Sequence, residues 1–293
     1  MKKALAIDIG GTKIFNTIVD ENGEILSEID KNQTPKTYDE MVKLLNEIVE
    51  KYENDVDVIA FATAGTVDKA NSKVLGSTAN LFKEYPTIDF KLLSKKTVYV
   101  ENDANSASWA EHKIGSSKGF DYSVMLTLGT GVGGGIILDN KLMRGKSGGA
   151  GEMHFKMRSD KHRRCTCGAY DCFEAYASGN GLKNTAVEIL NDANVTSYDV
   201  INKMKSGDEK MIEIFNKWQN DLINGIIGLA NLLDPDIFVL SGSMAEFVDF
   251  KYVESEVNKQ IVTMPTRVVL ASAGNYSGMI GVALLALESL GNG

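Results

Sequence analysis

The amino-acid sequence predicts an α/β protein built from two similar lobes. Residues 4–19 contain a β-rich run, a turn of glycine and threonine, and a second β-rich run, and residues 123–138 repeat this order. A strand hairpin must bury one face against other elements, so each repeat needs its own covering layer. The repeat therefore predicts two α/β lobes with a ligand held between them.

The first half continues with a helix and two more strands. The first hairpin turns at residues 20–23, and Thr37 and Glu40 then have the spacing of a capping box. The apolar residues that follow recur at helical spacing: Tyr38, Met41, Val42, Leu45, Ile48, Val49 and Tyr52. Residues 56–62 and 98–100 are predicted strands, and the second leads into an Ala-rich helix.

The lobe boundary is predicted near residues 113–121, just before the second repeat begins. The first lobe then contains residues 1–116, joined by a C-terminal helix over residues 278–293. Residues 117–277 form the second lobe, which includes a long helix around residues 211–233.

The composition is that of a globular protein and disfavours nucleic acid as a partner. The 293 residues include 39 acidic and 31 basic side chains, which gives a formal net charge of −8 and a sequence pI of about 5.1. Phosphate backbones require clustered basic surface, which an acidic chain does not favour. Hydrophobic residues make up 43% of the chain, so intrinsic disorder is excluded for most of it.

No segment predicts a membrane location. Runs of about eighteen apolar residues are absent from the sequence, and only four apolar residues separate Lys3 from Asp8, which is too short for a signal-peptide core. We therefore expect a cytoplasmic protein without a membrane partner.

Two familiar nucleotide-binding patterns are matched only in part. Residues 129–134 fit the spacing G-x-G-x-x-G, but residues 136–138 read as a strand, whereas a dinucleotide fingerprint opens a helix. Residues 145–147 resemble the end of a Walker loop, but Asn140 stands where that loop needs its first glycine. Neither pattern predicts a nucleotide site of its type.

The two glycine and threonine turns are better candidates for phosphate binding. Residues 10–13 and 129–135 offer bare N–H groups and hydroxyls, although either turn alone is more often a plain β-turn. Asp8 adds a third observation, because a carboxylate in a buried strand is costly unless Mg²⁺ or N–H groups of the turn bind it. Together these features favour a site that handles phosphate.

Five segments carry a resemblance over nearly the whole chain. They are Asp8-Ile9-Gly10-Gly11-Thr12-Lys13, Glu101-Asn102-Asp103-Ala104-Asn105, residues 129–135, Gly148-Gly149-Ala150-Gly151-Glu152, and Cys165-x-Cys167-Gly168 followed by residues 172–179. In this order they resemble the ROK group of sugar kinases, within the actin, Hsp70 and hexokinase superfamily. The resemblance implies a two-lobed, ribonuclease H-like ATPase fold with a cleft between the lobes, ATP and Mg²⁺ as cofactors, and a homodimer.

The resemblance also implies a role for each matching residue. Asp103 matches the catalytic base, which accepts the proton of the sugar hydroxyl as the oxygen attacks the γ-phosphate. Taken alone, Asp103 would be a helix N-cap before Ala104. The sugar-binding positions are Gly65, Thr66, Thr78, Asn102, Glu152 and Glu174. The positions for ATP and its phosphates are Asp8, Gly10, Gly11, Thr12, Lys13, Thr130, Gly131, Gly133 and Gly242.

The zinc motif of related kinases is matched incompletely. Three cysteines within eight residues are good metal ligands in a reducing compartment: Cys165, Cys167 and Cys172. Related kinases add a histidine, but Phe155 stands at its position and His154 comes one residue early. A shift of one residue reverses side-chain direction in an extended segment. Either His154 reaches a zinc ion, or His162 replaces it, or no zinc is bound; we carry forward a structural zinc with His154.

The predicted activity is ATP-dependent phosphorylation of a sugar hydroxyl at C6, with N-acetylmannosamine as the favoured sugar. Residues 63–68 resemble the loop of relatives that act on this sugar, and the small Ala64, Gly65 and Thr66 leave space for an axial N-acetyl group. Glucokinase or fructokinase activity is the alternative within the family. A sugar-sensing repressor is the alternative of another class, disfavoured by the net charge and by a phosphate motif that starts at Asp8.

Overall fold

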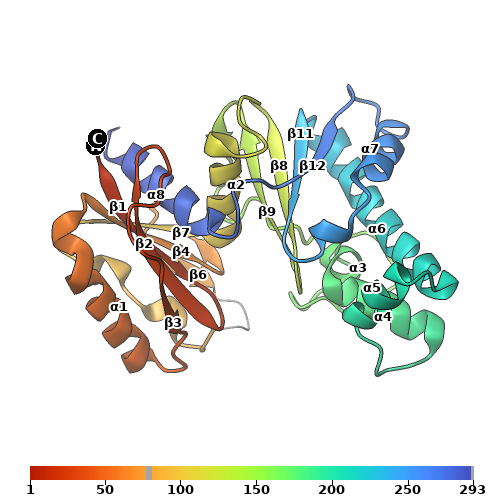
Figure 1. Cartoon of the computed structure of the whole chain (residues 1–293), viewed down its shortest axis with the longest axis horizontal. Coiled ribbons are helices and arrows are strands. Elements are labelled where there is room, and N and C mark those ends of the chain that lie inside the picture. Colours follow the sequence, from red (N-terminus) through yellow and green to blue (C-terminus); the bar gives the residue numbers. More distant parts are fainter. Residues whose placement is uncertain (77–80, 292–293) are drawn as a thin grey trace. The chain divides into compact units, whose positions relative to one another are not determined.

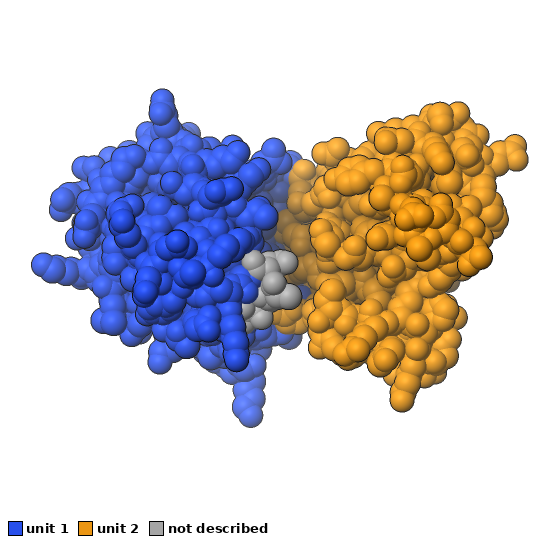
Figure 2. Space-filling view, turned by 90° about the horizontal axis from the view of Figure 1, so that it is seen from below, with its two compact units in different colours: residues 1–119, 135–151, 272–293 blue, residues 120–134, 152–271 orange. Residues whose placement is uncertain are grey.

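The computed structural model describes residues 1–76 and 81–291, which form two compact units. Figure 2 colours the two units separately. Unit 1 contains Met1–Gly119, Gly135–Gly151 and Ser272–Gly293, and unit 2 contains Phe120–Gly134 and Glu152–Ala271.

Residues 135–151 group with unit 1, whereas the sequence-based boundary counts them with the second lobe. Packing explains this difference. Ile137 and Leu142 are buried in the same apolar cluster as Ala4 and Trp109. The side chains of this segment thus complete the core of unit 1.

A five-stranded sheet with the order β3-β2-β1-β4-β7 forms the centre of unit 1. Its strands are β1 (Lys3–Ile9), β2 (Lys13–Asp20), β3 (Asp30–Gln33), β4 (Val58–Thr63) and β7 (Thr97–Asn102). β1 pairs antiparallel with β2 and parallel with β4, and β4 pairs parallel with β7. The carboxyl ends of β1, β4 and β7 therefore meet at one edge of the sheet.

Helices cover both faces of this sheet because β1 is apolar on both sides. Leu5, Ile7 and Ile9 belong to the buried cluster formed with α1, and Ala4 and Ala6 belong to the cluster formed with α8. In Figure 1, α1 and α8 lie on opposite sides of the strands. The helices are α1 (Tyr38–Tyr52), α2 (Asp103–Ile114) and α8 (Ser277–Ser289), and β5 (Thr66–Val67) and β6 (Val74–Gly76) form a short antiparallel pair.

The second sheet has the order β10-β9-β8-β11-β12. Its strands are β8 (Ser123–Leu128), β9 (Val132–Leu138), β10 (Lys141–Leu142), β11 (Ile237–Ser241) and β12 (Arg267–Leu270). β9 runs from unit 2 into unit 1 at Gly134 and Gly135. The helices of unit 2 are α3 (Glu174–Ala177), α4 (Gly179–Leu190), α5 (Ser197–Lys205), α6 (Glu209–Leu233) and α7 (Phe250–Asn258).

The predicted α/β architecture and its repeated module are confirmed. β1 lies between β2 and β4 in the first sheet as β8 lies between β9 and β11 in the second. The predicted capping box of α1 is wrong: the hydroxyl of Thr37 donates to the Glu40 carboxylate at 2.9 Å, and α1 has no side-chain cap on its backbone. Within the described part of the chain, no helix combines the length and hydropathy that crossing a membrane requires.

Candidate active site

The predicted base Asp103 lies where β7 passes into α2. Asn102 is the N-cap of α2, and its Oδ1 accepts the N–H of Asn105 at 3.0 Å. The alternative in which Asp103 itself caps the helix is therefore wrong. Asp103 is the first residue of α2, and its Oδ1 accepts the N–H of Ala104 at 2.8 Å. The positive end of the helix dipole favours a negative charge at this position.

Asp8 lies at the same edge of the sheet and is difficult to ionise. Burial, together with the negative charge of Asp103, raises the pKa of Asp8 from 3.8 to about 7. The start of α8 is close as well, because a Cβ at Gly278 would lie 3.2 Å from Asp8 Oδ2. Two interacting carboxylates are a donor set that suits a hard divalent cation such as Mg²⁺.

We expect the substitution Asp8→Asn to stabilise the ligand-free protein at high pH in the absence of divalent cations. The folded state holds the Asp8 proton up to about pH 7, whereas the unfolded chain releases it near 3.8. Wild-type stability therefore falls as the pH rises between these values, and asparagine has no proton to lose. After allowance for solvent screening, the variant should be more stable by about 1–3 kcal/mol at pH 8.

Thermal unfolding at pH 4, 6 and 8 measures this effect. The difference in melting temperature between Asp8→Asn and wild type should be smallest at pH 4 and increase with pH. A difference in melting temperature that stays constant from pH 4 to pH 8 would show that ionisation of Asp8 does not destabilise the folded state.

Asn102, a predicted sugar-binding residue of unit 1, contacts a second one, Gly65. Its Nδ2 donates to the carbonyl oxygen of Gly65 at 3.0 Å, so one side chain caps α2 and holds this loop. Gly65 has a φ of +102°, and a Cβ there would overlap with the carbonyl oxygen of Gly76, so the position requires glycine. Thr66 follows as the first residue of β5. Thr78 lies outside the described residues.

The first phosphate turn joins β1 to β2 and contains Gly10, Gly11, Thr12 and Lys13. The N–H of Gly10 donates to the carbonyl of Lys13 at 3.0 Å and closes the turn. Thr34 holds it from the side, because its hydroxyl donates to the Gly10 carbonyl at 2.7 Å. Thr12 and Lys13 are exposed, so a hydroxyl and an ammonium group are available to an anion.

The second phosphate turn joins β8 to β9. The N–H of Gly129 donates to the carbonyl of Gly131 at 3.0 Å, and the N–H of Gly133 donates to the Thr127 hydroxyl at 3.1 Å. The predicted phosphate contact of Gly133 would thus compete with a bond inside the protein. Thr130 is exposed, so Thr130 and Gly131 form the more open part of the turn.

Glu174 connects the second turn with the cysteine-containing loop. One carboxylate oxygen accepts the N–H of Val132 at 3.1 Å, and a Cβ at Gly131 would overlap with this oxygen. The other oxygen accepts the hydroxyl of Thr166 and the thiol of Cys165, the latter at 3.3 Å. Both oxygens of Glu174 therefore have protein partners within unit 2, and its contact with a sugar stays a prediction.

A cavity of about 310 Å³ opens beside the second turn. Thr130 lines it together with the aromatic side chains of Tyr198 and Phe247. Gly242 precedes the lining residue Ser243; it has a φ of +86°, and a Cβ there would overlap with the backbone of Leu128. An aromatic-lined cavity next to a phosphate turn suits a purine nucleotide.

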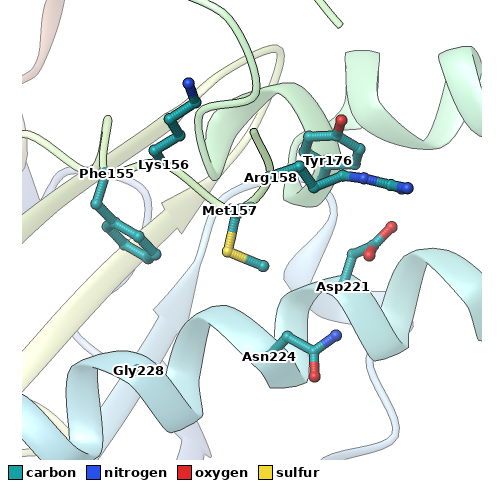
Figure 3. A pocket seen from close by; sticks show the side chains of 8 residues that line it. All are labelled: Phe155, Lys156, Met157, Arg158, Tyr176, Asp221, Asn224 and Gly228. Atoms are coloured by element: carbon teal, nitrogen blue, oxygen red, sulfur yellow. The ribbon is translucent and has the colours of Figure 1, made fainter. Parts of the chain in front are cut away.

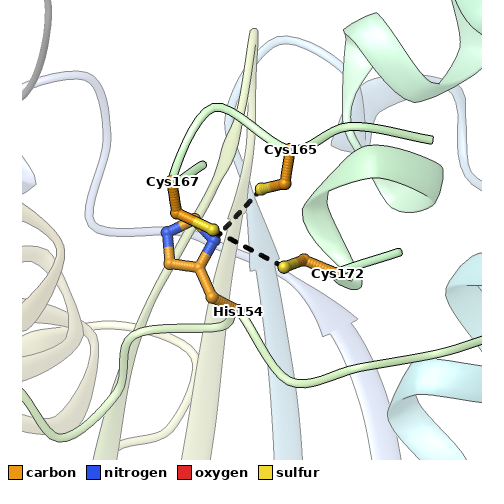
Figure 4. A group of neighbouring side chains, drawn as sticks. All are labelled: His154, Cys165, Cys167 and Cys172. Atoms are coloured by element: carbon orange, nitrogen blue, oxygen red, sulfur yellow. Dashed lines mark hydrogen bonds between the residues drawn. The ribbon is translucent and has the colours of Figure 1, made fainter. Parts of the chain in front are cut away.

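Four predicted metal ligands come together in unit 2, as Figure 4 shows. The ligand atoms of His154, Cys165, Cys167 and Cys172 all lie within 4.8 Å of one another. The sulfurs of Cys167 and Cys172 are 3.6 Å apart, close to the ~3.8 Å expected for tetrahedral zinc with bonds of about 2.3 Å. The set therefore fits a structural zinc ion. Burial raises the pKa of the Cys165 thiol, so a metal ion must displace its proton.

The histidine that joins this cluster is His154. Its Nδ1 lies 3.5 Å from the sulfur of Cys165, and its Nε2 lies 3.7 Å from Glu152 Oε2. The alternative with His162 is wrong for the described residues, because the cluster contains His154 and the Nε2 of His162 lies 3.2 Å from Oε1 of Glu188 instead. His154 thus reaches the cluster although it comes one residue before the histidine position of related kinases.

Phe155 takes a packing role at the position where related kinases have their histidine. Its ring stacks on Phe173 at a centroid distance of 4.9 Å. Figure 3 shows this ring directed toward α6, at the wall of a cavity of about 490 Å³ that Gly228 also lines. Asp171 adopts a φ of +59°, and its carboxylate accepts the Tyr176 hydroxyl at 2.8 Å.

Sequence reasoning missed Tyr198 at the cavity beside Thr130, and Arg144, which pairs with Glu101 two residues before Asp103. Tyr198 is 75% exposed, and an aromatic residue at the start of an otherwise polar helix is a weak signal that could have indicated it. Arg144 precedes a glycine-rich segment, which by itself does not reveal its partner.

The comparisons with known proteins show the family of the chain. The model of the ROK family matches residues 4–289. The glucokinase of Streptomyces coelicolor is 31% identical, over 98% of each chain. The N-acetylmannosamine kinase of Yersinia pseudotuberculosis is also 31% identical, over 99% of this chain and 100% of the relative.

A solved structure supports the same relationship. The ROK family glucokinase of Streptomyces griseus, in complex with glucose and AMPPNP, is similar with a TM-score of 0.77. It is 31% identical over 98% of this chain and 99% of its own. The predicted fold of the actin and hexokinase type is thereby confirmed. From the matched family model and these kinase relatives, we conclude that the chain belongs to the ROK family and is one of its sugar kinases.

Proposed function

We propose that this sugar kinase transfers the γ-phosphoryl group of ATP to the C6 hydroxyl of N-acetylmannosamine. One observation carries the proposal: Asp103 starts α2 directly after Asn102, and the side chain of Asn102 holds Gly65. Gly65 belongs to residues 63–68, called the sugar loop below. A proton acceptor and a hydroxyl-binding loop are therefore held by one short segment of unit 1.

Asp103 acts as the base in this reaction. The carboxylate accepts the proton of the C6 hydroxyl while the new O–P bond forms. The bond from the γ-phosphorus to the bridging oxygen breaks, and ADP leaves with that electron pair. An ordinary aspartate is too weak a base to ionise an alcohol beforehand, so it orients the hydroxyl and takes the proton late.

ATP is the proposed phosphoryl donor. The cavity beside Thr130 has aromatic walls at Tyr198 and Phe247, which suit an adenine ring. The similar glucokinase of Streptomyces griseus was solved with AMPPNP. Asp8 would hold Mg²⁺ with its carboxylate, and the ion would supply charge neutralisation for the phosphates.

N-acetylmannosamine is favoured among the possible sugars on the chemistry of one loop. Ala64, Gly65 and Thr66 are small, and Thr66 adds a hydroxyl, so this loop offers space and a polar partner to an axial N-acetyl group. Phe155 counts against this sugar, because it stacks on Phe173 at the position where related kinases would place a histidine against the sugar ring. Glucose is the second candidate, because the Streptomyces coelicolor glucokinase and the Yersinia pseudotuberculosis enzyme are equally identical to this chain.

The test is a comparison of kcat/KM across a small panel of sugars in a coupled ADP-release assay. We expect kcat/KM for N-acetylmannosamine to exceed that for glucose by at least about tenfold, or roughly 1.4 kcal/mol in transition-state binding. A higher kcat/KM for glucose or fructose would reject N-acetylmannosamine as the substrate, while the assignment as a sugar kinase would hold.

Three further properties complete the proposal. A structural zinc ion held by His154 and the three cysteines would fix the loop that carries Cys165 and Thr166 against Glu174. The family resemblance supports a homodimer. ATP and a sugar phosphate as reactants support a cytoplasmic enzyme, and the net charge of −8 argues against a nucleic-acid partner.

A further inference from the structure

The carboxylate of Glu101 is buried and contacts both residues that flank the proposed base on the N-cap and first turn of α2, Asn102 and Asn105. Its side chain is 2% exposed and lies at the end of β7, two residues before Asp103. Oε1 accepts the N–H of Asn102 at 3.0 Å and Nδ2 of Asn105 at 3.1 Å. Oε2 accepts Nδ2 of Asn71 at 3.1 Å and Nε of Arg144 at 2.7 Å. Glu101 therefore connects the strand end, the first turn of α2 and a distant arginine.

Arg144 supplies the positive charge that this buried carboxylate requires. Its side chain is 25% exposed, and besides Glu101 its Nη2 donates to the hydroxyl of Tyr99. In the part of the chain that the structure describes, Arg144 is the only cation in an ion pair with Glu101. A buried carboxylate that loses such a partner becomes strongly unfavourable. The position of Glu101 thus depends on Arg144.

The backbone of Arg144 begins the glycine-rich segment that packs on the sugar loop. Its carbonyl accepts the N–H of Ala150 at 3.2 Å. Gly148 has a φ of +91°, and a Cβ there would overlap with the carbonyl oxygen of Val67 in β5. A Cβ at Gly149 would lie 3.5 Å from the side chain of Thr66. Arg144 therefore contacts the base-bearing segment with its side chain and starts the backbone that supports Thr66.

We propose that Arg144 is a positioning residue of this kinase, which holds Asn102 and Asp103 in place through Glu101 and keeps them in register with the sugar loop. The inference rests on the proposed role of Asp103 as the base. The chain of contacts runs from Arg144 to Glu101, from Glu101 to the N–H of Asn102, and from Asn102 to Gly65 and α2. Each contact fixes the position of the next group, so loss of the Arg144 contacts should displace both the base and the bound sugar.

The first variant is Arg144→Met, which keeps most of the volume and removes the charge and the donors. We expect kcat/KM for the sugar to fall roughly 30- to 100-fold, with a lower kcat and a higher KM for the sugar. The KM for ATP should stay within about twofold, because the nucleotide cavity is built from residues of unit 2. Arg144→Lys keeps the charge, so the decrease in log(kcat/KM) for the sugar should be at most half of the decrease in Arg144→Met.

A stability control separates positioning from a general loss of folding. Val49→Ala creates a cavity in the fully buried contact between α1 and the sheet and should cost about 1–3 kcal/mol, without touching the site. If Val49→Ala reproduces the rise in sugar KM at a matched melting temperature, the positioning role is rejected. A rise in ATP KM equal to the rise in sugar KM for Arg144→Met would reject it as well.

The double variant Asp103→Asn/Arg144→Met distinguishes failure of this inference from failure of the proposed base. If Arg144 acts through Asp103, its effect on kcat should shrink to less than about threefold in the Asp103→Asn background. Additive losses would overturn the positioning role while Asp103 stands as the base. An Asp103→Asn variant with nearly normal kcat would remove the base itself, whatever Arg144 does.

Discussion

Replacing Asp103 with asparagine is expected to lower kcat by roughly 10²- to 10⁴-fold while the fold and the affinity for sugar are kept. Asparagine has nearly the same size and can still accept the N–H of Ala104, which the aspartate accepts at 2.8 Å. It cannot accept the proton of the sugar hydroxyl. The substitution therefore slows the chemical step. Steady-state kinetics measures the decrease in kcat, and calorimetry measures the affinity for sugar.

Asp249 offers a matched control for this substitution. It also stands at the start of a helix, where its carboxylate accepts the N–H of Tyr252 at 3.1 Å, but it belongs to α7 in unit 2. Asp249→Asn should leave kcat within about twofold. If Asp103→Asn retained activity within a few-fold of wild type, Asp103 would not be the base.

Replacing Cys167 with serine is expected to remove bound zinc and to destabilise unit 2 by several kcal/mol. Cys167 is exposed, so in the absence of metal its substitution should change stability by no more than about 0.5 kcal/mol. With zinc bound, the same substitution removes one of four ligands, and the binding energy of the metal is part of the folding energy. Metal analysis of protein purified without chelators and thermal unfolding measure both consequences.

Ala169→Ser is the matched control, because Ala169 is exposed on the same loop and its carbonyl accepts the N–H of Cys165 at 2.8 Å. This variant should keep one equivalent of zinc per chain and the wild-type melting temperature. Less than a tenth of an equivalent in wild type, with an unchanged melting temperature for Cys167→Ser, would reject the metal site.

The elements with strong local signals were predictable from the sequence. The run of small and apolar residues in β1 and the glycine turn after it define the hairpin, and the helical spacing from Tyr38 to Tyr52 defines α1. β5 and β6 span two and three residues, which is too short for any periodic pattern. Their pairing depends on Gly65 and its approach to Gly76, which is a tertiary contact.

The candidate site divides in the same way. Asn102 ends a strand and Asp103 begins a helix, so a local motif was enough to indicate both residues. Glu101 and Arg144 are 43 residues apart, and nothing in either neighbourhood indicates that they pair. The direction of the His154 side chain could not be read from the sequence either. It depends on the fold of the loop that carries Cys165, which is closed by the hydrogen bond from the N–H of Cys165 to the carbonyl of Ala169.

The most direct test of the account is ADP release by the wild-type enzyme with ATP and Mg²⁺ in parallel reactions containing N-acetylmannosamine, glucose, fructose, N-acetylglucosamine or no sugar. The account predicts release that depends on sugar, kcat/KM highest for N-acetylmannosamine by at least about tenfold over glucose, and a product with phosphate on C6. ADP release at the same rate without any sugar, or a product phosphorylated at another hydroxyl, would contradict it.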